Sequence, residues 1–366
     1  MRSSAFLFFF VVSCSSAGQS ATTSDASTDG PADASVDAGA HEELAYTSFV
    51  INTHDWVNPS QSADTLLRLV GIFEKYKVRG EFYFTAPVVD AYVAQRPDVI
   101  ARFKSSNMTI SYHIRAPHAL YQGFQAPLQG KTGSALSAIL KDYETYKLNL
   151  TDASLDKTKS GGFKRVAEAF DKKPFTISVS NVGPDDAIQA SAMDVYQGIG
   201  AKGAIVFHTG GTDPKDPLTT EHGLLVRPSD LGVSDFKVGN DTDYWWYRLI
   251  DPSVAAQWEP LTNMQSQVSA WTDKRKPFVA VLIHENNFKR TGSEPFNSIY
   301  HVMDGQYPKG VKPSPWDLST PDVTTSLTSE QSEAIFAAYE RMVAWASQHT
   351  RVVTMEDIAV MDESKL

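Results

Sequence analysis

The sequence predicts an α/β fold with a parallel sheet or barrel, because short apolar runs alternate with stretches of helical spacing. Residues 48–52 are an apolar run of strand length. Residues 64–76 carry apolar side chains at helical spacing, with Asp64 near the expected start. The same reasoning predicts strands at 80–85, 108–112, 175–179, 203–207, 278–283 and 351–354, and helices at 97–104 and 329–347. In such folds the chemistry gathers at the carboxyl ends of the strands.

The N-terminus predicts an export signal with a lipid anchor. Residues 5–12 are apolar but too short to span a bilayer, which takes roughly 20 residues. They lead into Val-Val-Ser-Cys at 11–14, which resembles the bacterial lipobox, whose cysteine is acylated. Cys14 is the only cysteine of the chain. We therefore expect a signal peptide at 1–14 and lipidation of Cys14; the alternative is a plain secretory signal in which Cys14 is incidental.

The remaining chain divides by composition into a tether and one globular domain. Residues 15–44 are mostly Ser, Thr, Asp, Ala and Gly, which predicts a disordered, extended tether. Residues 45–366 are long enough for one α/β domain. The net charge of −10 argues against a nucleic-acid partner, and only the anchor is expected to meet a membrane. We expect a monomer in the cell envelope, at the outer rather than the inner membrane, because serine and not aspartate follows Cys14.

Polar side chains follow several of the predicted strands. Five of the nine histidines stand just beyond a strand, which an even scatter would not produce. Histidine and aspartate together are good ligands for zinc and similar divalent metals, and a catalytic site needs three such ligands and an open position for water. The residues concerned are His54, Asp55, Trp56, His113, Arg115, His118, His208, His284 and Glu285.

These motifs resemble those of the NodB-type polysaccharide deacetylases, the carbohydrate esterase 4 superfamily. Asp55 matches that family's metal aspartate, and His113 with His118 matches its pair of metal histidines. Residues 282–284 match the late motif whose histidine is the general acid, and 351–354 match the closing strand. The resemblance covers roughly residues 46–358 and implies an irregular, seven-stranded (β/α) barrel.

The sequence departs from the family pattern at three places. His54 stands where the family has its catalytic aspartate. The histidines His113 and His118 are five positions apart where the family has four. Residues 178–183 contain no arginine, whereas the family's third motif holds an arginine that contacts the catalytic aspartate. The loss of the aspartate and the loss of its arginine agree with each other.

The resemblance implies a metal-dependent hydrolase that removes N-acetyl or O-acetyl groups from a carbohydrate. One divalent metal, zinc in our expectation, would be held by Asp55, His113 and His118, and would activate water. His54 would take the proton from that water, and His284 would protonate the leaving group. Each residue also has a structural alternative. Asp55 would cap its loop, the paired histidines would be hydrogen-bonded loop residues, and His54 would be a fourth ligand or an inert replacement.

Other residues are candidates for substrate binding. Arg115 would contact an anionic group or brace its loop. Trp56 would stack on a sugar ring, and Glu285 would orient its neighbours or be solvated. The aromatic run at 244–247, with Trp258 and Trp271, stacks on sugars or belongs to the core, and His208 is a supporting residue of the site. Residues 119–173 and 292–325 are expected as insertions that shape the substrate cleft.

Three functions are therefore open. The first is the metal-dependent deacetylase. The second is a glycoside hydrolase on a related barrel, which needs two carboxylates roughly 5–10 Å apart. Asp55, Glu285 and Asp185 or Asp186 are the candidates for that pair. The third is a carbohydrate-binding domain that has kept the fold and lost the chemistry, for which the missing aspartate and arginine argue.

Overall fold

In this computed structural model, seven parallel strands form one sheet in the order β10-β1-β2-β3-β6-β7-β9. The structure describes residues 44–178, 186–206, 219–228, 259–270, 279–292, 294–305 and 307–361. These residues belong to one compact unit, Glu43–Leu366. The seven strands are β1 (Tyr46–Thr53), β2 (Glu81–Phe84), β3 (Thr109–Tyr112), β6 (Thr176–Ser178), β7 (Gly203–Val206), β9 (Leu224–Pro228) and β10 (Val279–His284).

Two further strands extend this sheet and three small ribbons lie outside it. β15 pairs in parallel with the start of β1, and β8 pairs antiparallel with β9. The ribbons are β4 with β5, β11 with β14 and β12 with β13, all antiparallel. These strands are β4 (Tyr146–Leu148), β5 (Leu155–Ser160), β8 (Thr219–Glu221), β11 (Arg290–Thr291), β12 (His301–Asp304), β13 (Tyr307–Val311), β14 (Thr325–Ser326) and β15 (Arg351–Val352).

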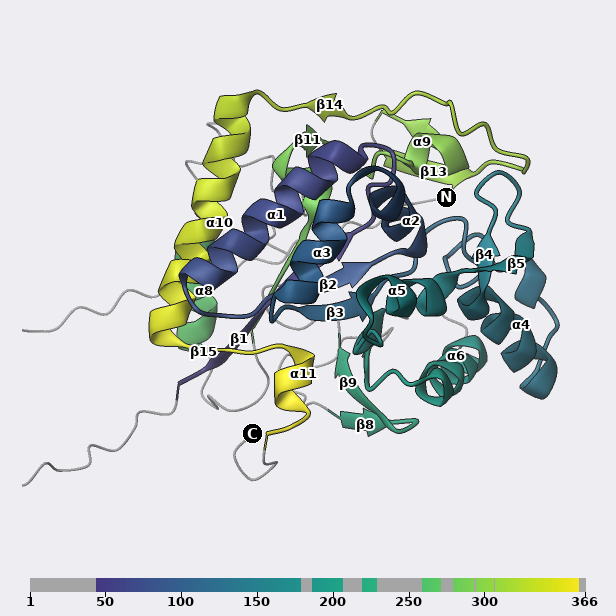
Figure 1. The fold of residues 1–366 in the computed structure, drawn as a ribbon, viewed down its shortest axis with the longest axis horizontal. Helices are drawn as coiled ribbons and strands as arrows, with labels where there is room; N and C mark the ends of the chain where they lie inside the picture. Colours follow the sequence, from purple (N-terminus) through teal and green to yellow (C-terminus); the bar gives the residue numbers. More distant parts are fainter. Residues whose placement is uncertain are drawn as a thin grey trace, which may run out of the picture. The chain divides into compact units, whose positions relative to one another are not determined.

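Helices pack on one face of the sheet. Figure 1 shows α1 and α10 side by side, and ion pairs from Arg68 to Glu333 and from Lys75 to Glu340 join them. The helices are α1 (Pro59–Lys75), α2 (Ala86–Gln95), α3 (Pro97–Ser105), α4 (Gly133–Thr145), α5 (Gly162–Phe170), α6 (Asp186–Ile199), α8 (Pro260–Ala270), α9 (Asn297–Tyr300), α10 (Ser329–His349) and α11 (Met355–Ile358), with the 3₁₀ turns η1 (Ala126–Leu128) and η3 (Glu285–Phe288). In the part of the chain that the structure describes, no helix is long and apolar enough to cross a bilayer.

The sheet curls. Along β1, Phe49 and Ile51 face the helices and belong to the main core, while Val50 points to the opposite face. There Val50 packs in one cluster with Tyr83 of β2 and Ile205 of β7. In a flat sheet β7 would lie about 14 Å from β2, three strand spacings away. Contact across that span requires curvature, so the predicted α/β fold with seven parallel strands in a barrel-like sheet is confirmed.

Local sequence signals explain where the main helices begin. Pro59 stands in the first turn of α1, where its missing N–H is not needed. The helix therefore starts before Asp64, and the prediction that Asp64 marks its start is wrong. Asp64 lies within the helix and is exposed. Thr328 and Gln331 form a capping box at the start of α10, as a Thr-x-x-Gln pattern predicts.

The segments expected as insertions contain regular structure. Residues 119–173 hold α4, the β4–β5 ribbon and α5, and α5 packs its buried face against α2 and the sheet. This segment is thus the connection from β3 to β6, not an addition to it. Residues 292–325 hold α9 and the β12–β13 ribbon.

We expect Phe49→Ala to lower the free energy of unfolding by about 3–5 kcal/mol, the usual cost of emptying an aromatic site in a core. Phe49 is fully buried and its ring lies 5.8 Å from that of Phe73 and 5.7 Å from that of Tyr339. Urea unfolding measures the loss. Val93→Ala is the control, because Val93 is 43% exposed and should change stability by less than about 0.5 kcal/mol. Equal effects of the two substitutions would contradict the packing described.

Candidate functional site

Parallel pairing brings polar residues from three strands to one edge of the sheet. Asn52 of β1 is in register with His284 of β10, and Phe84 of β2 with Tyr112 of β3. His54 and His113 therefore leave their strands at the same edge, and the backbone N–H of His113 continues the ladder to the carbonyl of Phe84 at 2.9 Å. The sequence prediction that these histidines share the carboxyl edge is confirmed by this register.

Arg115 is the centre of the polar cluster at this edge. Its Nε donates to Nδ1 of His54 at 3.2 Å, and its Nη2 lies 3.0 Å from Nε2 of His284. The carboxylate of Glu294 lies 3.4 Å from Nε. The Arg115 side chain is only 10% exposed, and its guanidinium lies over the ring of Tyr121. One cation thus joins the loop after β3 to the ends of β1 and β10 and to Glu294.

The donor-only chemistry of arginine fixes where the neighbouring protons lie. A guanidinium cannot accept a hydrogen bond, so Nδ1 of His54 and Nε2 of His284 must both present lone pairs to it. The proton of the His54 ring is then on Nε2, which lies 3.2 Å from the carbonyl oxygen of the Asn286 side chain. The side-chain amide nitrogen of Asn52 also lies 3.1 Å from Nε2 of His284.

These contacts keep the histidines neutral. The pKa of His54 is lowered well below its ordinary value, first by burial and then by the charge of Arg115 and by His284. Burial and Arg115 likewise lower the pKa of His284 to about 4. Burial alone would raise the pKa of Glu294, but the charge of Arg115, together with His284, holds it below its ordinary value. At neutral pH the cluster therefore contains one cation, one carboxylate and two neutral rings.

Glu285 holds the turn after β1. Its Oε1 accepts from the backbone N–H of His54 and of Asp55, both at 2.6 Å, and from the hydroxyl of Ser62 at 3.2 Å. Burial, and then repulsion from Asp55, raise the pKa of Glu285 to about 8. The side chain is fully buried, so Glu285 orients its neighbours. This is the alternative to solvation that the sequence left open, and its predicted place among the substrate-binding residues is not supported by its position.

Asp55 caps the loop that leads into α1. Its Oδ1 accepts from the backbone N–H of Asn58 at 2.9 Å, and both carboxylate oxygens lie 3.3 Å from the Asn58 side-chain amide. Burial raises the pKa of Asp55 to about 6, against the hydrogen bonds from Asn58. These contacts are the ones expected if Asp55 caps its loop, which is the alternative to metal binding.

His113 and His118 have different surroundings. Both ring nitrogens of His113 are buried without a hydrogen-bond partner among the described residues. In His118, Nδ1 accepts from the backbone N–H of Leu120 at 3.0 Å, and Nε2 lies 3.1 Å from Glu144. The two histidines help to line one cavity of about 30 Å³, room for about two water molecules.

The expected zinc triad is therefore not brought together as a ligand set. In the described part of the chain, the side chains grouped closely enough to hold a metal ion are His54, His284 and Glu294, and this group contains none of Asp55, His113 and His118. The two histidines are five positions apart on a loop, His118 lies beside Glu144, and Asn58 donates to the Asp55 carboxylate. Their role as metal ligands stays a prediction.

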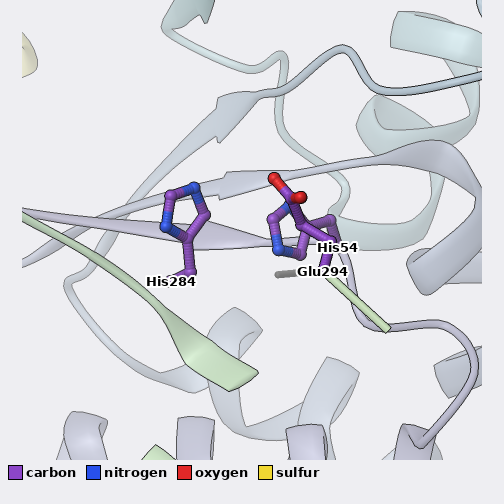
Figure 2. A group of neighbouring side chains, drawn as sticks. All are labelled: His54, His284 and Glu294. Carbon is purple, nitrogen blue, oxygen red and sulfur yellow. The ribbon is translucent and has the colours of Figure 1, made fainter. Parts of the chain in front are cut away.

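The His54, His284 and Glu294 group does not fit an added metal ion as it stands. Figure 2 shows the three side chains, whose ligand atoms lie within 4.8 Å of one another. Zinc would have to approach each ligand atom to about 2.0–2.2 Å. Arg115 already lies 3.0 to 3.4 Å from these side chains, with its N–H groups on the lone pairs of both histidines. A second cation in that place would meet both steric overlap and charge repulsion.

The remaining predicted residues are placed as follows. Trp56 is half-buried, lines the same cavity as His113, and its ring lies 6.5 Å from that of Phe296. Cys14, residues 179–183, His208, the aromatic run at 244–247, Trp258 and Trp271 lie outside the described residues.

Sequence reasoning missed three members of the cluster. Glu294 follows a short glycine-containing segment after β11 and carries no motif that would reveal it. Asn52 lies in β1, two residues before His54, and Asn286 lies in η3, two residues after His284. Their nearness to strand ends was the available signal.

Comparisons with known proteins give fold likenesses. No protein-family model matches this sequence, and no curated protein matches it. A carbohydrate esterase 4 family pseudoenzyme from Bacillus anthracis is 12% identical over 87% of this chain and 66% of its own, with a TM-score of 0.40. A Puue allantoinase is 12% identical over 91% and 97%, with a TM-score of 0.47. A peptidoglycan deacetylase from Bacillus subtilis is 11% identical over 86% and 90%, with a TM-score of 0.37. This chain spans less than two thirds of the pseudoenzyme.

We expect His284→Gln to reduce the loss of stability in acid. The folded pKa of His284, about 4, lies below its ordinary value of 6.5. As the pH falls, the unfolded chain therefore gains a proton on His284 before the folded chain does. The contribution of His284 to the free energy of unfolding is fully present above pH 6.5 and is lost as the pH falls toward 4. Glutamine does not titrate, so the difference in unfolding free energy between variant and wild type should move in favour of the variant over this window.

Urea unfolding at several pH values between 7 and 4 measures this difference. His349→Gln is the control, because His349 is an exposed histidine on α10. A His284→Gln difference that stays constant with pH, or that moves the other way, would show that the folded protein does not hold His284 neutral.

Proposed function

We propose that this chain binds a carbohydrate that carries an acyl or acidic group, at the carboxyl edge of the sheet, without metal-dependent hydrolysis. The observation that carries the proposal is the position of Arg115, which donates to the lone pairs of His54 and His284 and pairs with Glu294. Carbohydrate is the substrate class that the sequence motifs imply, and the curled parallel sheet is the fold expected with them.

The unused donors of Arg115 suit such a ligand. Of its five N–H groups, Nε and one group on Nη2 are directed at protein atoms in the contacts described above. A guanidinium recognises carboxylate and carbonyl oxygens well because its donors form a planar fork. Trp56, half-buried at the neighbouring turn, offers a flat ring for a sugar face.

The same contacts oppose hydrolysis. A general base must direct a lone pair at the water that it deprotonates. The lone pair of His54 on Nδ1 and that of His284 on Nε2 are directed at Arg115, and both rings have lowered pKa values. Of the candidate carboxylates for a glycoside hydrolase, Asp55 and Glu285 are buried and accept backbone hydrogen bonds. The contacts of these residues therefore hold the site in place and do not favour catalysis.

A second candidate is the metal-dependent deacetylase that the sequence implies, and one observation favours it. The two ring nitrogens of His113 are buried and have no hydrogen-bond partner in the described part of the chain, which is costly for a polar group. His113 and His118 line one cavity, and with Asp55 they would hold a zinc ion that activates water. This set would require Asp55 to leave Asn58 and His118 to leave Glu144.

We expect an N-acetylglucosamine oligomer to bind the purified chain and to release no acetate, with or without added zinc. Arg115→Gln should weaken binding on the order of tenfold, the effect of losing one charged hydrogen bond. Calorimetry measures binding, and an enzymatic acetate assay measures turnover. Arg165→Gln is the matched control, because Arg165 is a part-buried arginine paired with Asp90 of α2.

Zinc-dependent acetate release that is lost in Asp55→Ala would establish the second candidate instead. Absence of binding to N-acetylated, uronate-containing and neutral oligomers alike would refute carbohydrate recognition by this edge.

We also propose that Cys14 anchors the chain to the cell envelope, as the sequence at 11–14 indicates. Metabolic labelling with a palmitate analogue in a bacterial host should mark the wild-type chain and leave Cys14→Ala unmarked. The labelled wild-type chain should be in the membrane fraction, and the unlabelled Cys14→Ala chain should not. A Cys14→Ala chain that stays in the membrane fraction would show another means of attachment.

A further inference from the structure

Two imidazoles and a carboxylate converge on Arg115. His54 comes from the end of β1, His284 from the end of β10 and Glu294 from the segment after β11, and their ligand atoms lie within 4.8 Å of one another (Figure 2). Such a set of two histidines and one carboxylate is a common donor set for zinc and for other divalent transition metals. It differs from the triad that the sequence predicts, because it includes none of those three residues.

We propose that the guanidinium of Arg115 is a built-in cation that fills a latent metal site formed by His54, His284 and Glu294. The inference rests on the proposed function, in which Arg115 replaces metal chemistry at this edge. Removal of the guanidinium should expose the three ligand side chains to one another and allow a divalent transition metal to bind.

The contacts of Arg115 resemble those of a bound cation. Its N–H groups lie 3.2 Å from Nδ1 of His54 and 3.0 Å from Nε2 of His284, so that both lone pairs are directed at positive charge. The carboxylate of Glu294 supplies the negative charge, 3.4 Å from Nε. Asn297 donates to the other oxygen of Glu294 at 2.5 Å and so fixes the direction of the carboxylate.

The supports of these ligands do not depend on Arg115. Asn286 accepts from Nε2 of His54, an arrangement that orients a histidine so that Nδ1 faces a metal. Glu285 holds the backbone of His54 through two N–H groups on adjacent residues. The site should therefore keep its geometry when the arginine side chain is shortened.

The ring of His113 adds a second observation at the same place. It stacks on His54 with ring centroids 5.9 Å apart, is 2% exposed, and neither of its nitrogens has a hydrogen-bond partner among the described residues. An imidazole held in this way beside the cluster is available to a bound ion or to water on that ion.

The test compares bound zinc in the purified wild-type chain and in Arg115→Ala after equilibration with zinc and removal of the excess. Mass spectrometry of the metal should show about one more zinc per chain in the variant. Cobalt should show the absorption of a low-coordinate site in the variant alone. The additional zinc should be lost in Arg115→Ala combined with His54→Ala, and it should raise the Tm of the variant.

Arg79→Ala is the matched control. Arg79 is a part-buried arginine that pairs with two carboxylates, Glu356 and Asp357, at the opposite edge of the sheet, with no imidazole in the ion pairs described there. Its removal should add no zinc. If Arg115→Ala does not fold, Arg115→Val keeps apolar volume without a metal-ligating atom and answers the same question.

The outcomes separate this inference from the proposed function. A folded Arg115→Ala or Arg115→Val chain that gains no zinc would overturn the latent site. Wild-type zinc that is lost in His54→Ala and His284→Ala would overturn it too, because the metal would then displace Arg115 unaided. Wild-type zinc lost only in Asp55→Ala, with one more equivalent in Arg115→Ala, would support the latent site; if that wild-type zinc also releases acetate, the proposed function is overturned while the latent site stands.

Discussion

The parallel pairing of β1 is the constraint on which the edge depends. β1 pairs with β10 over Thr47–Asn52 and with β2 over Val50–Thr53, and all eight of its residues are buried. A shift of one residue in either register would turn Phe49 and Ile51 out of the main core. The hydrophobic pattern of one strand thus determines that Asn52 lies opposite His284 and that His54 leaves the sheet beside it.

The buried charge of Arg115 determines which side chains surround it at this edge. A buried guanidinium needs acceptors, and in this edge it has two imidazole lone pairs and a carboxylate. The arginine that contacts His54 comes from the loop after β3, whereas the family motif would supply one from the segment near 178–183. His54, which stands where the resembled motif has an aspartate, accepts from Arg115 as a neutral ring.

The sequence could predict the strands, their order in the chain and the clustering of histidines at their carboxyl ends, because apolar runs and strand ends are local features. It could not predict which side chains contact one another in the site. Arg115 meets residues 61 and 169 positions away, and those contacts depend on how the sheet curls. Asp55 is expected on a metal because its position matches a motif, and the motif gives no sign of the hydrogen bond that Asn58, three residues on, donates to its carboxylate. The segment that holds α4 and α5 was expected as an insertion, although Phe163, Val166 and Phe170 of α5 stand at helical spacing and are buried.

The three histidine rings at this edge form a column. His54 lies between His113 and His284, with centroid distances of 5.9 and 5.0 Å and ring planes within 26° of parallel. A proton on one ring would repel a proton on the next, and Arg115 already opposes both. A proton on any one of the three rings therefore makes protonation of its neighbour less favourable.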